Sequence, residues 1–303
     1  MNKLVQLRQT HEDGQSGKQD YIEAAHAWHA HLFAYPAFLE STDVEALCIR
    51  PEGVFVRSRS QRIELLLDPE DRHLVPFTLM NFREYETAET EFLKSLMHAN
   101  STVLDIGANC GWHSLAMSRH CPTARIHAFE PIPYTHDILL RNIQHNDCLN
   151  IEAHQTALSN QDGPLEFLYT PRCSGATSMA EAGQPVPPEQ LEKITCSGTT
   201  LDNFCAKHGL TPDIIKCDVE GAELMVIQGG LSILETHRPV ILVELLRKWS
   251  RRFGYHPNDV LMLLAGYGYQ AHTLSASGLE RCHGIDEKTV ETNFVFLHQQ
   301  KHG

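Results

Sequence analysis

A glycine-containing turn is the first segment of this sequence that has the composition of a ligand site. Residues 105–111 read Asp-Ile-Gly-Ala-Asn-Cys-Gly and join an apolar run to a helical pattern. In such a strand–turn–helix unit, backbone N–H groups and the positive helix end face the carboxyl edge of the sheet, where open α/β sheets bind ligands. Glycines permit the tight turn and a close approach of the ligand. We therefore expect cofactor contacts from Gly107, Ala108, Asn109 and Gly111.

The spacing of this turn favours a cofactor without phosphate. The glycines follow G-x-x-x-G and not the G-x-G-x-x-G of dinucleotide folds. Asp105 would repel a pyrophosphate, but it can serve an ammonium group or brace the loop. S-adenosylmethionine (SAM) carries an amino group and no phosphate, so it fits better than NAD. Glu130 and Pro131 follow the next apolar run, where a carboxylate can accept hydrogen bonds from two ribose hydroxyls.

Four charged residues near the ends of two later apolar runs could take part in methyl transfer from SAM. Such a transfer requires an aligned acceptor, and an acceptor that must lose a proton also requires a general base. Lys216, Asp218 and Glu220 point the same way if strand alternation persists. Glu244 lies in the apolar run 239–245, where an unpaired carboxylate is costly, so it needs a partner or faces the cleft. These four are the candidate catalytic residues.

Each candidate also has a simpler structural interpretation. Asp218 could hold the cofactor's amino group, and Lys216 could only pair with a carboxylate. Glu220 and Glu223 could complement a helix dipole. Asp218, Glu220 and Glu244 are also the hard oxygen ligands that Mg²⁺ prefers, and a divalent cation would acidify an acceptor hydroxyl. The sequence leaves these alternatives open.

Alternating strand and helix patterns position these residues. Helical patterns occur around 88–98, 133–147, 221–235 and 257–267, between apolar runs at 125–130, 150–158, 213–219, 239–245, 269–274 and 293–298. This alternation predicts an α/β fold with a mostly parallel sheet and helices on both faces. The turn at Thr156, Ala157 and Leu158 is in place to contact adenine. A hairpin of 165–170 and 193–198 is predicted around the proline-rich loop 181–190.

The first 82 residues differ from the rest and are predicted to form an accessory region. Residues 1–20 are polar and expected to be disordered, residues 21–34 have a helical pattern, and 46–82 alternate like a small β element. This region could recognise substrate or mediate dimerisation. Residues 83–303 are expected to form the catalytic domain.

Composition limits the compartment and the partners. The chain has 303 residues and a net charge of −13, which disfavours a nucleic-acid face. It has neither a run of about 18 apolar residues for a membrane span nor the apolar core of a signal peptide. The nine cysteines include no C-x-x-C pair, so we expect reduced thiols and no zinc ribbon. We expect a cytoplasmic protein that could form a homo-oligomer.

Several segments together resemble the FkbM-type SAM-dependent methyltransferases. They are VLDIGANCGWHSL, HAFEP, TTLDNF and IIKCDVEGAEL, and the resemblance spans about residues 83–298. The most specific piece, residues 216–223, is similar to K-x-D-V-E-G-x-E. Tyr85-Glu86 resembles the family's lead-in, so Glu86 is also taken as cofactor-binding. Cys110 and Cys217 stand where the family usually has aliphatic residues.

The resemblance implies a class I (Rossmann-like) methyltransferase fold whose seven-stranded sheet has an antiparallel last strand. It also implies methyl transfer, most often to a hydroxyl of a sugar or natural product. An NAD-type Rossmann oxidoreductase is an alternative, although it would need phosphate binding by a turn of the wrong spacing. A non-catalytic binding module is another, although its hallmark would be lost cofactor residues, and Asp105, Gly107, Gly111 and Glu130 all remain.

Overall fold

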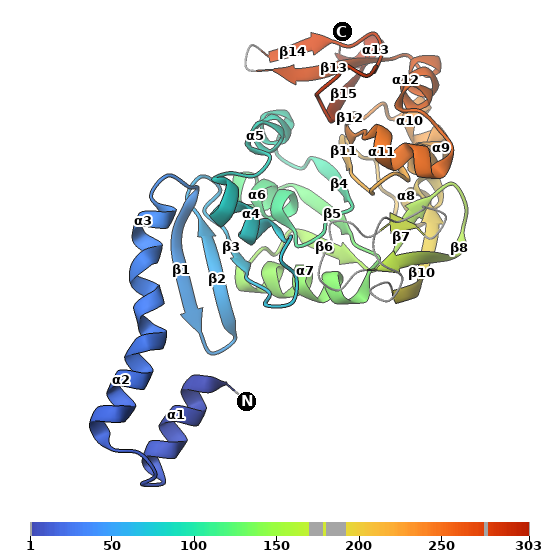
Figure 1. Cartoon of the computed structure of the whole chain (residues 1–303). Helices are drawn as coiled ribbons and strands as arrows, with labels where there is room; N and C mark the ends of the chain where they lie inside the picture. The colour runs from blue at the N-terminus through green and yellow to red at the C-terminus, as the bar shows by residue number, and fades with distance from the viewer. Residues whose placement is uncertain (1, 170–177, 180–191, 276–277, 303) are drawn as a thin grey trace.

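A central mixed sheet of eight strands organises the chain (Figure 1). The structure, a computed structural model, describes residues 2–169, 178–179, 192–275 and 278–302. In spatial order the strands are β14 (Gly278–Arg281), β13 (Tyr269–Ser275), β15 (Asn293–His298), β12 (Val240–Glu244), β11 (Ile214–Cys217), β4 (Thr102–Ile106), β5 (Arg125–Phe129) and β6 (Ile151–His154).

The strand directions confirm the predicted α/β architecture. Neighbouring strands from β12 through β11, β4 and β5 to β6 pair in parallel, whereas β15 is antiparallel to both β12 and β13. One strand was not expected: β14 pairs with the edge strand β13, and all four of its residues are exposed. It therefore lacks the apolar pattern that revealed the other strands.

Helices cover both faces because successive strand residues point to opposite sides. Val103 packs with Leu93 and Met117 on one face, whereas Leu104 and Ile106 pack with Phe204 and Val226 on the other. The first face carries α5 (Thr87–Leu96), α6 (Trp112–His120) and α7 (Pro133–His145). The second carries α8 (Leu201–His208), α9 (Glu223–Gln228), α10 (Leu231–Thr236) and α12 (Pro257–Gly266). Three short helices are α11 (Arg247–Ser250), η4 (Arg251–Phe253) and α13 (Gln299–His302).

The helix predicted over 221–235 is divided in two. Helix α9 ends at Gln228 and α10 begins at Leu231, with Gly229 and Gly230 between them. A Cβ atom at Gly229 would lie 2.0 Å from the backbone oxygen of Ser159. The chain passes so close to its neighbour here that only glycine fits.

Residues 3–39 form helices that extend away from the body of the molecule (Figure 1). They are α1 (Lys3–Glu12), α2 (Lys18–His29), η1 (Ala30–Ala34) and α3 (Tyr35–Leu39). Residues 1–20 were expected to be disordered, and the structure places α1 and the first residues of α2 in this segment. Asn2 caps α1 by accepting from the Leu4 N–H, and the His11 and Tyr21 rings stack at 4.9 Å, which joins α1 to α2.

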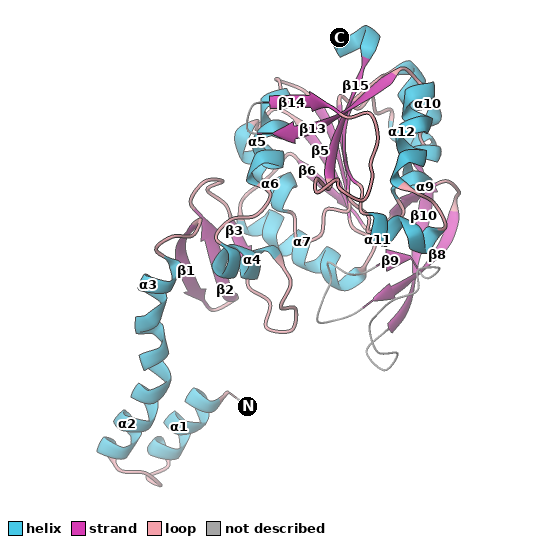
Figure 2. Ribbon diagram, turned by 45° about the horizontal axis from the view of Figure 1, so that its top comes forward, coloured by secondary structure: helices cyan, strands magenta, loops and turns pink. Residues whose placement is uncertain are grey.

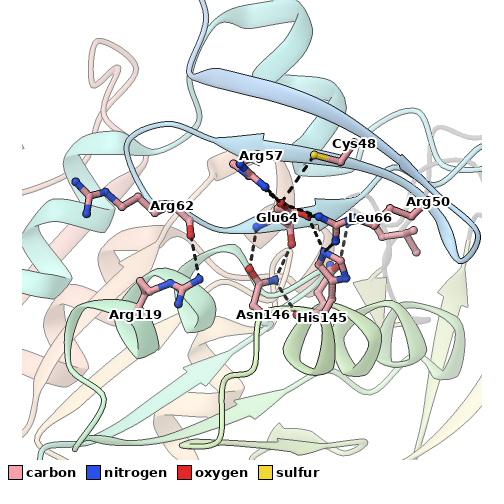
Figure 3. Close-up of polar contacts among 10 residues, drawn as sticks. Cys48, Arg50, Arg57, Arg62, Glu64, Leu66, Arg119, His145 and Asn146 are labelled. Atoms are coloured by element: carbon pink, nitrogen blue, oxygen red, sulfur yellow. Dashed lines mark hydrogen bonds and ion pairs between the residues drawn. The ribbon is translucent and has the colours of Figure 1, made fainter.

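The rest of the segment that was predicted to be an accessory region packs directly on residues 83–303. Strands β1 (Val44–Arg50), β2 (Gly53–Ser58) and β3 (Glu64–Leu66) form an antiparallel sheet, followed by α4 (Val75–Phe82). Asn146, directly after α7, accepts from the Glu64 N–H and donates to its carbonyl, at 2.8 and 2.7 Å (Figure 3). Asn142 accepts from the Leu66 N–H. Residues of both regions share one apolar core, among them Ile63, Leu79, Trp112 and Ile138.

A second small sheet lies beside the carboxyl edge of the main one (Figure 2). Its order is β7 (Ala157–Ser159), β10 (Glu192–Thr200), β8 (Gly163–Tyr169) and β9 (Ser178–Met179). The antiparallel pairing of β8 with β10 confirms the predicted hairpin. The proline-rich loop 181–190 lies outside the described residues. Nowhere in the described chain is a helix long and apolar enough to cross a membrane.

Candidate active site

A cavity opens at the carboxyl edge of the sheet and has a volume of about 1060 Å³ when the open mouth is counted. Small-molecule sites lie in concave pockets at this edge of α/β sheets. Its walls include most of the predicted site residues, namely Gly107, Ala108, Asn109, Glu130, Pro131, Thr156, Ala157, Leu158, Lys216, Asp218 and Glu220. They follow different strands, and the parallel sheet brings them to one edge.

The glycine turn after β4 is closely packed against the end of β11. Gly107 has φ +80°, and a Cβ atom there would lie 1.7 Å from the backbone oxygen of Asp218. The Gly107 and Ala108 N–H groups donate to the Phe129 carbonyl at 3.0 and 2.9 Å. Gly111, also at positive φ, is the N-cap of α6. These contacts fix the backbone of the turn, which forms one wall of the cavity.

Glu130, directly after β5, is a buried carboxylate on the cavity wall. It accepts from the Asn109 N–H at 3.1 Å and from the Ile132 N–H at 3.0 Å. Burial raises the pKa of Glu130 to about 7, although these two backbone donors oppose the shift. The group can therefore change its charge near neutral pH, and a ligand that donates to it would favour the ionised form.

Asp105 is buried behind the glycine turn and is not among the residues that line the cavity. Its carboxyl accepts from the Ser114 hydroxyl at 2.6 Å, and its second oxygen is 3.6 Å from the Lys216 ammonium. Lys216 donates to the Gly107 carbonyl at 3.1 Å and lies 3.4 Å from Asp218. Burial lowers the pKa of Lys216, but the charges of Asp218 and Asp105 outweigh burial and raise it. This arrangement fits the bracing alternative for Asp105 and the ion-pairing alternative for Lys216.

Three carboxyl groups converge where β11 and β12 end. Cys217 pairs with Val243, so Asp218 and Glu244 follow neighbouring strand positions. Asp218, Glu220 and Glu244 each place an oxygen within 4.8 Å of the others. Burial, and next the charge of Asp218, raise the pKa of Glu220 and Glu244 far above the usual range. Such a group of acids can hold and pass protons, and its oxygens are of the kind that bind a divalent cation.

Two further acidic residues have structural partners. Glu86, at the N-cap of α5 with φ +40°, lies 2.6 Å from His113 Nε2. Burial raises the pKa of Glu86, but the hydrogen bond and charge of His113 together with the charge of Lys216 and a hydrogen bond from Tyr85 lower it on balance. His113, not Glu86, lines the cavity. Glu223 accepts from the Val219 and Gly221 N–H groups and from the Tyr255 hydroxyl, so it holds the loop that carries Glu220.

Several cavity residues were not predicted, and four of them come from outside the motifs. His73 and Val75 belong to the accessory region, and Phe167 and Met179 belong to the small second sheet. The others are Tyr85, Ile106, Trp112, His113, Phe129, Ile132, Val219 and Ala222. Tyr85 and Trp112 lie within or beside the motif segments and could have been found there. No sequence signal connects His73 or Met179 to the site.

Glutamine at position 244 should stabilise the ligand-free protein at alkaline pH. Folding raises the pKa of the Glu244 carboxyl above its unfolded value near 4.5. Between these two pKa values the unfolded chain loses the proton more readily than the folded one, so the free energy of unfolding falls as pH rises. Glu244→Gln removes this loss, so its gain over wild type should grow from pH 5 to pH 9 and reach about 1 kcal/mol or more. Thermal unfolding at several pH values measures it. The exposed control Glu291→Gln should show no such trend, and an equal trend in both variants would contradict the burial of Glu244.

Comparison with known proteins agrees with this geometry. The model of the methyltransferase FkbM domain matches residues 105–271, more than half of the chain. Methyltransferase sdnD of Sordaria araneosa is 30% identical over 178 residues, which cover 50% of this chain and 68% of that protein.

Two other relatives have names that mention an acceptor or a position. Hexuronic acid methyltransferase AglP of Haloferax volcanii is 29% identical over 163 residues, covering 53% of this chain and 60% of its own length. 2-O-methyltransferase NoeI of Sinorhizobium fredii is 26% identical over 159 residues, covering 49% and 65%. This chain therefore spans less than two thirds of the latter two relatives. The match of the domain model, together with the sheet order and the glycine turn, places this chain in the FkbM methyltransferase family.

Proposed function

We propose that this protein is a SAM-dependent methyltransferase that methylates a hydroxyl oxygen of a sugar or another natural-product small molecule. The observation that carries the proposal is a cavity that joins the glycine turn and Glu130 to Asp218 and Glu220, two of the three converging carboxyl groups. The first part suits a nucleoside and the second suits removal of a proton from an alcohol. The name of AglP mentions a hexuronic acid and that of NoeI a 2-O position, which support a sugar as the acceptor molecule and oxygen as the acceptor atom, respectively.

Three features of the described residues suit SAM: an open approach to the backbone of the glycine turn, a carboxylate and an apolar wall. The turn at Gly107 leaves no room for a side chain, so a ligand can approach the backbone. Glu130 offers a carboxylate on the cavity wall for two vicinal hydroxyls. Phe129, Ala157 and Leu158 supply an apolar wall suited to a flat base. No phosphate-binding cation is needed for such a ligand.

The chain's own residues must align the acceptor and take its proton. When bound, SAM would supply an electrophilic methyl carbon, with the neutral thioether sulfur of S-adenosylhomocysteine as the leaving group for an in-line attack by oxygen. Because Glu220 and Glu244 have strongly raised pKa values, they hold protons at neutral pH. This leaves Asp218, 3.4 Å from the Lys216 ammonium, as the candidate base of the cluster. Lys216 would orient it.

A divalent cation at Asp218, Glu220 and Glu244 remains a separate prediction. The cation would replace the protons on the two glutamates and lower the pKa of a bound hydroxyl. Turnover measured after chelation and again with added Mg²⁺ tests it. Full activity after chelation would exclude a metal requirement and leave Asp218 as the base.

S-adenosylhomocysteine (SAH) should bind this protein with an affinity that depends on Glu130. The ribose hydroxyls donate to the ionised carboxylate, so affinity should rise as pH increases from 6 to 8 through the Glu130 pKa of about 7. Glu130→Gln should weaken SAH binding about 10- to 100-fold and flatten the pH dependence. Calorimetric titrations with SAH and, separately, NADH measure both effects.

The exposed variant Glu166→Gln, on β8, is the matched control and should bind SAH like wild type. Binding of NADH alone would contradict the proposed cofactor. Absence of both would favour a binding module for another ligand. A Glu130→Gln variant that folds and binds SAH normally would remove Glu130 from the site.

A further inference from the structure

Two histidines and a glutamate meet at the edge of the main sheet, outside the cavity wall. His127 belongs to β5, and Glu152 and His154 belong to the edge strand β6. The strands pair in parallel with His127 opposite Glu152 and Phe129 opposite His154. All three side chains thus project from neighbouring positions of a rigid backbone.

Their ligand atoms are spaced like the first shell of a metal ion. His127 Nδ1 lies 3.0 Å from His154 Nε2 and 3.6 Å from a Glu152 carboxylate oxygen. His154 Nε2 is 3.9 Å from the other carboxylate oxygen. Tetrahedral zinc with bonds near 2.0–2.1 Å separates its ligand atoms by about 3.3–3.5 Å. Only small movements are needed, and the Glu152 side chain, 62% exposed, is free to make them.

The surroundings keep both imidazoles ready to coordinate. The rings are stacked 5.3 Å apart, and Phe204 packs edge-on against His154. Burial lowers the pKa of both histidines, that of His154 to about 4. Neutral rings keep a lone pair for a metal, whereas protonated rings would repel it. The alternative is a hydrogen bond between the two rings without a metal. It would explain the contact of His127 with His154, but it would give the nearby Glu152 carboxylate no role.

We propose that His127, Glu152 and His154 form a site for a divalent transition metal of the zinc class. Two nitrogens and one oxygen match the ligand preference of Zn²⁺ and Co²⁺, and the exposed side leaves a position for water. The metal would tie the edge strand β6 to β5. This site differs from the acidic cluster of Asp218, whose oxygen-only ligands favour Mg²⁺.

A consequence for the cavity follows from the neighbours of His154. Its carbonyl accepts from the Glu130 N–H at 3.1 Å, and its ring packs 5.0 Å from Phe129. Both Glu130 and Phe129 line the cavity. Metal binding should therefore stiffen one wall of the cavity and raise the thermal stability of the protein.

Cobalt titration of the full chain, purified without a histidine tag, tests the proposal. We expect one equivalent of Co²⁺ to give a visible absorption band that Zn²⁺ displaces. His154→Ala should weaken binding at least 10-fold, and Glu152→Gln, an exposed change that leaves the fold intact, should weaken it about 10-fold. Zn²⁺ should raise the melting temperature of wild type more than that of either variant.

The 19 histidines of the chain make a matched control necessary. His26 and His29 are exposed on the N-terminal helix α2, and their double alanine variant should bind Co²⁺ like wild type. Absence of a cobalt band in wild type would overturn the proposal. So would a band that persists in Glu152→Gln and His154→Ala but disappears in the His26/His29 variant.

Discussion

Replacing Asp218 by asparagine should abolish most methyl transfer and leave SAH affinity within a few-fold of wild type. The carboxylate lies on the cavity wall beside Glu220 and Glu244, both of which have strongly raised pKa values. Asparagine keeps the size of the side chain and cannot accept a proton, so turnover should fall about 10²- to 10⁴-fold. Single-turnover rates with SAM and an accepted sugar, together with SAH calorimetry, separate the two effects.

Two outcomes would assign Asp218 to another role. A parallel loss of SAH affinity would mean that it holds the cofactor, which is the alternative that the sequence left open. Full turnover would exclude it as base and as metal ligand. Asp286→Asn, an exposed change at a position outside the cavity, is the matched control and should leave both quantities unchanged.

The acidic cluster could be predicted because parallel strands end at one edge of a sheet. Asp218 directly follows β11 and Glu244 is the last residue of β12, and the register of Cys217 with Val243 brings them together. The glycine turn and Glu130 were predicted for the same reason. In each case the motif lies at the end of a strand or immediately after it, so the fold class determines which edge of the sheet it reaches.

Other features depend on packing between distant segments, which local pattern does not encode. His73 reaches the cavity because β3 is held on α7 by Asn142 and Asn146, more than 60 positions later in the sequence. Asp105 has the expected place in the turn, but its contact with Ser114 turns it away from the cavity. The sequence shows that a carboxylate is present; the opposing helix decides what it contacts.

Helix α1 was not predicted for a related reason, whereas the helical pattern over 21–34 was recognised. Helix α1 has no buried residue, so it shows no apolar stripe to predict it from. Its contacts are a cap at Asn2 and a ring contact of His11 with Tyr21. Composition indicates whether a segment can build an apolar core. It does not indicate whether a neighbouring helix stabilises that segment.

Alanine at position 107 should eliminate most SAH binding, because among the glycines that the structure describes this one has the nearest neighbour to an added methyl group. Its Cβ would lie 1.7 Å from the Asp218 backbone oxygen, about half of an ordinary contact distance. The turn and the end of β11 would have to separate, which moves the cavity wall, the Lys216 contact to the Gly107 carbonyl and Asp218 together. We expect SAH affinity to fall 100-fold or more, measured by calorimetry on protein whose folding is checked by circular dichroism.

A second glycine separates this clash from the cost of backbone conformation. Gly209 has φ +62°, close to the φ +80° of Gly107, but a Cβ atom added there would have nothing within 4 Å. Gly209→Ala should therefore lose about 1–2 kcal/mol of stability from left-handed strain alone and bind SAH normally. If both variants lose stability equally and both keep SAH affinity, the close approach of the turn to β11 is not what shapes the cofactor site. If only Gly107→Ala loses SAH, the contact between two strand ends is as much a part of the site as any side chain that lines it.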